Sequence, residues 1–454
     1  MNTLQIQKYN VQGPRYTSYP TVPFWDEGSF KVEDWTNSVK RTFDETNNKD
    51  GISIYIHLPF CESLCTFCGC NKHITKRHED VEDPYLEAVL KEWKMYVAIM
   101  GAKPYIKELH LGGGTPTFFS PENLKKLING IFEDAYYAPE YEYSFEGHPN
   151  NTTKEHLQAL FDVGFRRVSF GIQDYDPKVQ KAINRVQPFE HVENVTRWAR
   201  QIGYTSVGHD LIYGLPFQTL RSIIQTISNT AQLMPDRIAF YSYAHVPWLK
   251  NGQRGFDEND LPKDDAKLNL FLAGKSLLTG LGYVEVGMDH FSLEEDGLTK
   301  AMYGHSLHRN FMGYTALHTK LLIGLGVSAI GDSWYAFGQN VKTLKEYQTH
   351  IDANQLPIYR GHHLTEEDLV VRKHILNIMC KFETYWINQE DRLEDIEDIL
   401  GTLDEMKEEG LVEFLKGGIR VTEEGRPFVR NICMAFDKRL SRAKLDTPTF
   451  SKTI

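Results

Sequence analysis

The chain has 454 residues, of which 41% are hydrophobic and 24% charged, and a formal net charge of −11 at pH 7. These values are typical of a globular protein larger than one small domain. The negative charge disfavours nonspecific binding to nucleic acid or anionic membranes. No apolar run approaches the roughly 20 residues that a membrane helix needs. Residues 1–23 lack the apolar stretch of a signal peptide, so a cytoplasmic location is expected.

Residues 1–48 are predicted to form an N-terminal arm. The arm contains the segment Gly13–Pro20, which has a proline at each side of its aromatic centre. Because proline lacks the N–H group that a helix requires, we expect an extended segment that lies over the rest of the protein.

Residues 49–345 alternate between strand and helix patterns. The predicted strands are Ile52–His57, Ile106–Leu111, Glu142–Glu146, Arg167–Gly171, Ser206–Ile212, Ile238–Tyr243 and Tyr283–Val286. Between them, Leu86, Val89, Trp93 and Val97 recur at helical spacing, and Thr152 with Glu155 is expected to cap another helix. This alternation predicts an α/β fold with a parallel sheet. A barrel or partial barrel fits the number of strands best, and a doubly wound open sheet is the alternative.

Residues 346–454 are predicted to form a mostly helical C-terminal domain. Leu369–Met379 and Leu393–Met406 have helical patterns, and Val412–Leu415 with Ile419–Thr422 has the pattern of a hairpin. Helices followed by a hairpin resemble a winged helix, which often binds DNA. The acidic residues around the hairpin argue against that role, so we expect a lid or a packing function.

Four of the six cysteines lie between residues 61 and 70. Cys61, Cys65 and Cys68 have the spacing C-x₃-C-x₂-C, and three thiolates can hold three irons of a 4Fe–4S cluster and leave the fourth iron open. A structural zinc site usually pairs two C-x₂-C motifs that are far apart in sequence, and a redox disulfide needs only two cysteines. The cluster is therefore the favoured interpretation. Cys380 and Cys433 lie among apolar residues and are expected in a core.

The three-cysteine motif after a strand resembles that of the radical S-adenosylmethionine (SAM) superfamily. The longer C-x₃-C-x₂-C-x-C form, which includes Cys70, resembles the oxygen-independent coproporphyrinogen III oxidases. The same family resemblance extends over nearly the whole chain, through the segments 13–21, 112–117, 210–216, 288–291, 307–310 and 431–433. It implies a partial (β/α)6-type radical SAM barrel and decarboxylation of two propionates of a tetrapyrrole. It also implies a 4Fe–4S cluster, two SAM molecules, and an unidentified electron donor and acceptor.

The resemblance also implies a set of cofactor contacts. They are Tyr55, Phe67, Gly69, Gly113, Gly114, Thr115, Glu146, Gln173, Arg185, Asp210, Ala244 and Ile330. Several of them end predicted strands, and ligands of parallel sheets bind at the carboxyl ends of the strands. Cys70 is not needed as a cluster ligand if SAM occupies the fourth iron. We predict a catalytic role for it in substrate handling or in proton or electron delivery, with a small buried thiol as the alternative.

Cations near the mouth of the barrel are needed to bind the carboxylates of the substrate. The candidates are Arg15, Lys72, Arg77, Arg309 and Lys320, of which Arg15 is favoured because the arm could fold over the site. His148 and His209 depart from the usual family pattern, and they either alter hydrogen bonding around the adenosine or reflect lineage variation. A monomer is expected. The rival functions are a haem chaperone and a haem-acting methyltransferase of the same superfamily, and Cys70 and the Gly13–Thr21 segment favour the oxidase.

Overall fold

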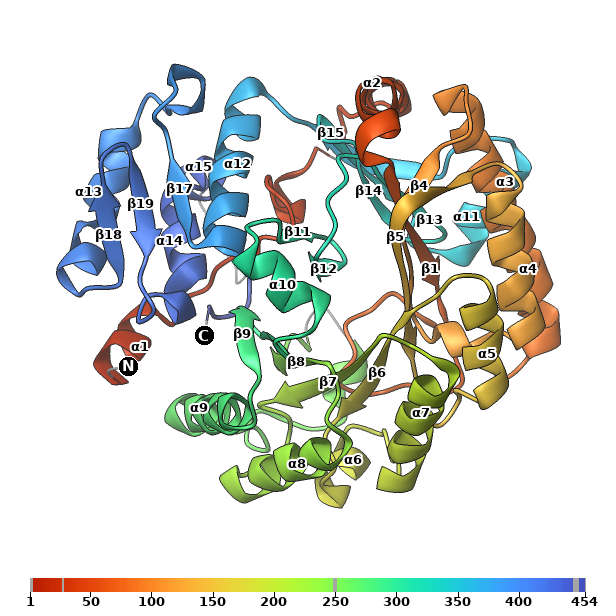
Figure 1. Cartoon of the computed structure of the whole chain (residues 1–454), viewed down its shortest axis with the longest axis horizontal. Coiled ribbons are helices and arrows are strands. Elements are labelled where there is room, and N and C mark those ends of the chain that lie inside the picture. Colours follow the sequence, from red (N-terminus) through yellow and green to blue (C-terminus); the bar gives the residue numbers. More distant parts are fainter. Residues whose placement is uncertain (1–2, 27, 248–250, 444–448, 454) are drawn as a thin grey trace.

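A computed structural model describes residues 3–26, 28–247, 251–443 and 449–453. Within these residues the largest sheet has 12 strands in the order β16-β15-β14-β13-β1-β4-β5-β6-β7-β8-β10-β9 (Figure 1). Its strands are β1 (Ile52–Leu58), β4 (Tyr105–Gly113), β5 (Tyr136–Gly147), β6 (Arg167–Gln173), β7 (Ser206–Tyr213), β8 (Arg237–Ser242), β9 (Val284–Gly287), β10 (His290–Ser292), β13 (Leu322–Leu325), β14 (Ile330–Asp332), β15 (Ala336–Asn340) and β16 (Ile358–His363).

The centre of this sheet is parallel. Strands β1 and β4 to β8 pair in parallel, in chain order, and a helical segment follows each of them. These helices are α3 (His78–Met100), α4 (Pro121–Phe132), α5 (Lys154–Asp162), α6 (Pro177–Ala182), α7 (Phe189–Ile202), α8 (Leu220–Leu233) and α9 (Asp264–Gly280). Figure 1 shows α3 to α5 and α7 to α9 along the outer side of the curved sheet. The predicted α/β fold with a six-strand partial barrel is confirmed. On one side β13 adds a further parallel strand beside β1, and antiparallel strands lie at both edges of the sheet.

The two faces of the parallel strands differ in polarity. On β4, Leu109 and Leu111 are fully buried in the apolar core beneath the helices, where they meet Leu86 and Trp93 of α3. The alternate residue His110 faces the inside of the barrel, where it bonds to Ser144 of β5. Successive residues of a strand point to opposite faces, so each strand supplies one apolar face to the core and one polar face to the interior of the barrel.

A buried carboxylate joins the helices to the edge of the sheet. Glu92 of α3 accepts hydrogen bonds from the Gly326 N–H (2.8 Å), the Asn340 amide (2.7 Å) and the Tyr347 hydroxyl (2.7 Å). Tyr347 belongs to α11 (Leu344–Asp352). Burial raises the pKa of Glu92 to about 7, although the three donors act in the opposite direction. Folding therefore favours the protonated form of this side chain.

We expect this carboxyl to make the stability of the protein depend on pH. A carboxyl group whose pKa is raised in the folded state contributes most stability below its unfolded pKa, and that contribution is lost as the pH rises through the folded value. Between about pH 4.5 and 7 the loss is about 3 kcal/mol. Urea denaturation at pH 5.5 and 8 should show a smaller loss for Glu92→Gln than for the unmodified protein. The exposed Glu87→Gln on the same helix is the control, and an equal loss in all three proteins would disprove the assignment.

The arm is helical at both ends, so the prediction of an extended arm was wrong for those parts. The two helices are α1 (Thr3–Tyr9) and α2 (Val32–Asp50). In α2, Trp35, Val39 and Phe43 recur every four residues and are buried against the sheet. The prolines of the segment Gly13–Pro20 exclude a helix only from the chain between these two helices.

One predicted helix cap lies a residue away from its observed position. Helix α5 is capped by Thr153, whose hydroxyl accepts from the His156 N–H (3.3 Å), while the His156 ring accepts from the Thr153 N–H (3.2 Å). The predicted pair of Thr152 and Glu155 is therefore wrong by one position. Both threonines are suitable caps, and sequence patterns fix helix ends only to within a residue or two.

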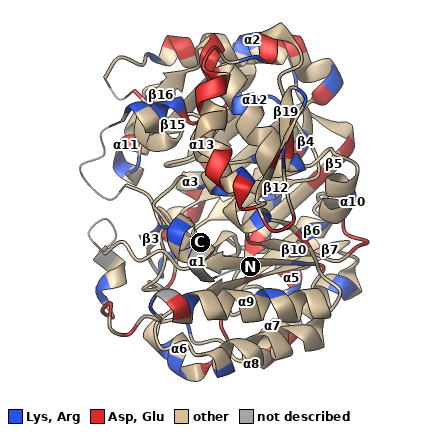
Figure 2. Cartoon of the chain, turned by 90° about the vertical axis from the view of Figure 1, so that its left-hand side faces the viewer, with Lys and Arg blue, Asp and Glu red and all other residues tan. Residues whose placement is uncertain are grey.

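The C-terminal region has its own apolar core. Its elements are α12 (Glu366–Lys381), β17 (Glu383–Tyr385), α13 (Ile396–Glu408), β18 (Val412–Leu415), β19 (Gly418–Val421), α14 (Val429–Phe436) and α15 (Lys438–Arg442). Cys380 and Cys433 are buried in this core, as predicted. Both predicted helices and the hairpin are present, and β17 extends the hairpin to three strands. Figure 2 shows acidic residues, in red, along α13. The main sheet continues through β16, beyond residue 345.

Shorter elements connect these parts of the fold. They are β2 (Phe60–Cys61), β3 (His73–Ile74), α10 (Gly297–Tyr303), β11 (His308–Asn310), β12 (Gly313–Thr315) and five short 3₁₀ helices, of which Arg426–Phe428 precedes α14. Among the residues described, no helix combines the length and the apolar character that crossing a bilayer would require.

Candidate active site

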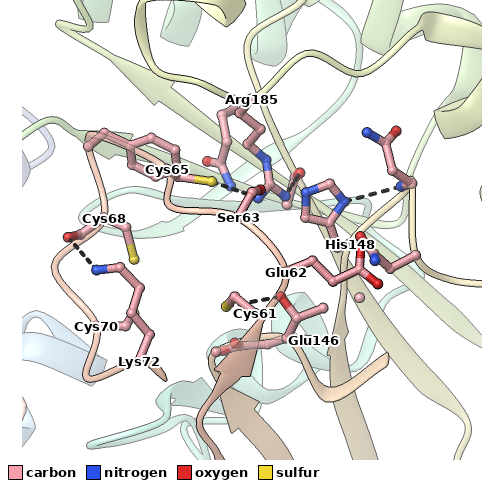
Figure 3. Close-up of a pocket in the computed structure, with 18 of the residues that line it drawn as sticks. Cys61, Glu62, Ser63, Cys65, Cys68, Cys70, Lys72, Glu146, His148 and Arg185 are labelled. Carbon is pink, nitrogen blue, oxygen red and sulfur yellow. Dashed lines mark hydrogen bonds between the residues drawn. The ribbon is translucent and has the colours of Figure 1, made fainter. Parts of the chain in front are cut away.

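A cavity of about 500 Å³ lies at the carboxyl ends of the parallel strands. We call it the cysteine cavity. It is lined by most of the residues that the sequence predicted, namely Cys61, Cys65, Phe67, Cys68, Cys70, Gly113, Gly114, Thr115, Glu146, Gln173, Arg185 and Asp210. Figure 3 shows the four cysteines on one loop, facing Glu146, His148 and Arg185 from the neighbouring strands and loops.

The cysteine loop runs from β2 to β3, and polar side chains contact its sulfur atoms. The Thr115 hydroxyl lies 3.3 Å from Cys61 Sγ, and Arg185 Nη1 donates to Cys65 Sγ at 3.6 Å (Figure 3). In the described part of the chain, no three cysteine, histidine or carboxylate side chains converge closely enough to hold a single metal ion. A 4Fe–4S cluster takes one thiolate per iron, so its ligands need not converge on one point.

The segment Gly112–Thr115, which we call the glycine loop, ends β4, and two of its glycines allow it to approach the cysteine loop. Gly113 has φ +113°, and a Cβ atom there would lie 2.6 Å from the His57 ring. A Cβ atom on Gly114 would lie 2.6 Å from the carbonyl of Pro59. His57 itself is buried, and its ring bonds to the Tyr55 hydroxyl (3.1 Å) and the Asn71 carbonyl (2.9 Å). These contacts give His57 a structural role at the end of the cysteine loop.

Two carboxyl groups of the cysteine cavity differ in their protonation. Burial acts to raise the pKa of Glu146, but hydrogen bonds from His110 and the Gly113 N–H lower it below its ordinary value. Burial and the nearby charge of Glu146 raise the pKa of Asp210 to about 7, although Ser169 donates to it at 2.9 Å. Near neutral pH the cavity therefore offers an ionised acceptor beside a carboxyl group that can also donate.

Arg185 and His148 form the polar wall opposite the cysteines. Arg185 Nη2 donates to the Gly171 carbonyl (2.5 Å), while its buried Nε atom has no partner among the described residues. Burial and the Arg185 charge keep the pKa of His148 well below its ordinary value, so the ring is neutral. His209 instead points away from the cavity, and its ring bonds to Thr196 of α7 (3.0 Å). Of the two departures from the family pattern, only His148 therefore reaches the site.

Four predicted cofactor contacts are not among the residues that line the cysteine cavity. They are Tyr55, Gly69, Ala244 and Ile330. Tyr55 lies inside the barrel, and a Cβ atom on Gly112 would be 3.1 Å from its ring. The Ala244 carbonyl accepts from the Gln253 amide (3.2 Å) just beyond β8. The roles of these four residues stay predictions.

The predicted substrate cations are dispersed. Lys72 lines the cysteine cavity, and its Nζ atom donates to the Cys68 carbonyl (3.3 Å). The Arg77 side chain is 83% exposed at the start of α3. Lys320 precedes β13, which runs parallel to β1 with Leu322 beside Ser53, so it lies at the opposite end of the sheet from the cysteines. The prediction that Lys320 lies at the mouth of the barrel was wrong. Arg15 and Arg309 lie near Asp289, outside the cysteine cavity.

Several further residues of the site were not predicted from the sequence. His110 contacts Glu146, and Tyr241 and Ile212 line the cavity. An alternation of polar and apolar residues marks the inner face of the strands and could have identified part of this set. Glu108, His110 and Gly112 alternate on β4, and matching positions follow on the next strands, namely Glu142, Ser144, Glu146, Arg167, Ser169, Gly171, Gly208 and Asp210.

Comparisons with known proteins indicate the same kind of site, that of a radical SAM enzyme. Residues 55–229 match the model of the Radical SAM superfamily. The oxygen-independent coproporphyrinogen III oxidase of Synechocystis is 38% identical over 458 residues, covering 99% of this chain and 97% of that protein. The Escherichia coli K12 protein of the same name is 38% identical, with the same coverage. The solved structure of coproporphyrinogen III oxidase (HemN) from Escherichia coli, described as a radical SAM enzyme, has a TM-score of 0.89 at 36% identity and covers 96% of this chain and 99% of that one.

The partial barrel and the three cysteines at the carboxyl ends of its strands define the class as radical SAM enzymes. The sequence identity to these oxidases extends over nearly the whole chain and identifies the family within this class. The chain belongs to the family of oxygen-independent coproporphyrinogen III oxidases.

The residues of the cysteine cavity fit the cofactors of a radical SAM enzyme. Three thiols on one loop match the three cysteine ligands of an open 4Fe–4S cluster. The buried, unpartnered Nε atom of Arg185 suits an anion such as the SAM carboxylate. Glu146 and Asp210 supply partners for amino and hydroxyl groups.

We expect Thr115 to raise the reduction potential of the cluster. When Cys61 is a thiolate, the Thr115 hydroxyl at 3.3 Å must be the donor, and hydrogen bonds to cluster sulfurs favour the more negative, reduced state. In Thr115→Val about ten times less cluster should be reduced at a fixed solution potential, a shift of about 59 mV for a one-electron couple. An anaerobic redox titration followed by electron paramagnetic resonance measures this shift. Thr115→Ser keeps the hydroxyl and should match the unmodified protein, and an unchanged potential in Thr115→Val would remove the assignment.

Proposed function

We propose that this chain converts coproporphyrinogen III to protoporphyrinogen IX without oxygen. Cys61, Cys65 and Cys68 would hold a 4Fe–4S cluster that, given one electron by an external donor, would supply with SAM the radical chemistry that removes a hydrogen atom from the β carbon of a substrate propionate, leaving methionine and 5′-deoxyadenosine. The remaining group loses carbon dioxide and one electron and becomes a vinyl group, and two propionates react in this way. The electron goes to a one-electron acceptor outside the chain.

The residues of the cysteine cavity position these groups and exclude water. In this proposal, Cys61, Cys65 and Cys68 hold the cluster. Thr115, with Gly113, Gly114 and Gln173, lies along the bound SAM, while Glu146 and Asp210 bind its amino and hydroxyl groups. Arg185 clamps a carboxylate. We further propose that the cavity takes two SAM molecules, and that the protein works as a cytoplasmic monomer with separate partners that donate and accept electrons.

The observation that carries the proposal is the joint position of the three cysteines, Arg185 and the glycine loop around one cavity, in a chain that matches coproporphyrinogen III oxidases from end to end. The experiment is an anaerobic assay of the reconstituted protein with SAM, a reductant and coproporphyrinogen III. The proposal requires carbon dioxide and a divinyl product in a ratio of two to one. Tight haem binding without decarboxylation would indicate a chaperone, and methyl transfer to haem would indicate a methyltransferase.

Cys70 is proposed to act on the substrate rather than to hold iron. Cys70 lines the cysteine cavity two residues beyond Cys68, and it is an exposed residue. We expect Cys70→Ser to keep four irons per chain and to cleave SAM, but to release carbon dioxide at least about tenfold more slowly, a barrier increase of roughly 1.4 kcal/mol. Iron analysis and the rate of carbon dioxide release test this directly. Full activity in Cys70→Ser would leave Cys70 with no catalytic role.

A further inference from the structure

A second, smaller cavity of about 50 Å³ lies where the arm, the barrel and the C-terminal region meet. We call it the junction cavity. The barrel contributes Tyr213 and Ser242, which are the last residues of β7 and β8, so it lies at the same end of the sheet as the cysteine cavity. The arm contributes Arg15, and α14 and the C-terminal tail contribute Arg430 and Lys452. Figures 1 and 2 show both chain ends together near α9.

The junction cavity has an excess of positive charge. Arg15, Arg426, Arg430 and Lys452 line it, and Asp289 is the only acidic residue among its described lining residues. Beside it, Lys267 Nζ lies 6.0 Å from the centre of the Tyr213 ring. Burial, together with repulsion from Lys452 and Arg15, lowers the pKa of Lys267 to about 8. Of the four lining cations only Arg430 is buried, and Arg426 also pairs with Glu423 at 2.7 Å. Among the described residues the positive charges at the cavity still outnumber the negative ones, so this site is suited to an anion.

The cations differ in how fully the protein satisfies them. Arg430 donates to the carbonyls of Gly13, Pro14 and Lys452, so its guanidinium is occupied although its charge remains. Arg15 pairs with Asp289 through Nη2. Its Nε and Nη1 atoms have no partner among the described residues, and its side chain keeps 34% of its surface accessible. Arg15 can therefore donate a further charge-assisted hydrogen bond to an added anion.

Arg15 also connects the two cavities. Its Cζ atom lies 6.0 Å from the centre of the Tyr241 ring, and Tyr241 lines the cysteine cavity. The two cavities are thus neighbours across Tyr241, but they share no lining residue. A ligand that lies in the cysteine cavity can extend a side arm past Tyr241, while an anion held in the junction cavity stays apart from the cysteines.

We propose that the junction cavity binds one carboxylate of the tetrapyrrole, on a propionate that is retained in the product. This inference rests on the proposed function. The volume suits a carboxylate and not a pyrrole ring, and the apolar side chains Phe271, Met288 and Val429 suit the two methylene groups of a propionate. Because the cavity shares no wall with the cysteines, its carboxylate is not one that reacts. The arm and the C-terminal region thereby become parts of the substrate site.

The test measures binding of two unreactive porphyrins to the reconstituted full-length protein by fluorescence titration. Coproporphyrin III carries all four propionates, and mesoporphyrin IX carries ethyl groups in place of the two reactive ones. Arg15→Gln should raise the dissociation constants of both porphyrins about tenfold, because a charge-assisted pair is lost from both. Arg15→Lys, which keeps the charge, should restore most of the affinity.

Lys267→Met tests the same site if Arg15→Gln does not fold. It should also weaken binding of both porphyrins, while Lys263→Met, which alters an exposed lysine just before α9, should not. Unchanged affinities in a folded Arg15→Gln protein would overturn the proposal. So would a loss confined to coproporphyrin III, which would assign the cavity to a reactive propionate, or a failure of the unmodified protein to bind either porphyrin. The two proposals can fail separately. If both porphyrins bind with the expected variant effects but no carbon dioxide is released from coproporphyrinogen III, the subsite is supported and the proposed function is contradicted.

Discussion

Cys68→Ala is expected to abolish both cluster assembly and SAM cleavage. Only three thiols of this cavity are available in the spacing of the family motif, so removing one leaves an iron of the cluster without a protein ligand. Iron content should fall well below four per chain, and 5′-deoxyadenosine formation should fall by more than about 1000-fold, an increase of roughly 4 kcal/mol in the barrier. Iron and sulfide analysis with chromatography of the SAM products measures both effects.

Cys380→Ala is the matched control for this loss. Cys380 is also a free thiol, but it is buried in the core of the C-terminal region, away from the cysteine cavity. Removing its sulfur should leave four irons per chain and normal SAM cleavage, at a cost to stability of about 1 kcal/mol. A Cys68→Ala protein that assembled a complete cluster and cleaved SAM would refute the assignment of the three ligands.

The cysteine loop and the positions of the parallel strands could be predicted because both follow from local patterns. The close spacing of Cys61, Cys65 and Cys68 brings three thiols to one loop. Each parallel strand is a short segment with apolar residues at alternate positions. Glu146 and Asp210 reach the cavity because each lies at the carboxyl end of a predicted strand. Such side chains meet at one edge of a parallel sheet.

Other features depend on contacts between distant segments, so no local pattern reveals them. Arg15 pairs with Asp289, which is 274 residues later in the chain, and nothing near either residue indicates the other. Lys320 looked like a cation of the barrel mouth, but the direction of β13 places it at the opposite end. The helix α2 is a different case. Its apolar residues at every fourth position were visible in the sequence, and the nearby prolines were given too much weight.

The buried side chain of Arg430 binds the backbone of the arm, and Arg430→Ala is expected to loosen the arm. Arg430 Nε donates to the Pro14 carbonyl at 2.8 Å and Nη1 to the Lys452 carbonyl at 2.9 Å, and Nη2 donates to Gly13. Alanine leaves these three carbonyl groups without their donor. Since each unsatisfied buried group costs about 1–3 kcal/mol, the arm should lose roughly 3 kcal/mol or more of its attachment.

Limited trypsin digestion with mass spectrometry measures this release. In Arg430→Ala, cleavage after Arg15 should become faster by about two orders of magnitude, because the local opening free energy falls by roughly 3 kcal/mol. The control is Arg442→Ala. The Arg442 side chain is 65% exposed and forms an ion pair with Glu367, so its removal should change the protection of the arm little. Since Arg15 and Lys452 line the junction cavity from the two segments that Arg430 joins, the same variant should also bind porphyrins more weakly. Tyr16 and Tyr19 of the arm are also buried against the C-terminal core. If Arg430→Ala left the arm as protected from trypsin as in the unmodified protein, these apolar contacts would be sufficient to hold it without Arg430.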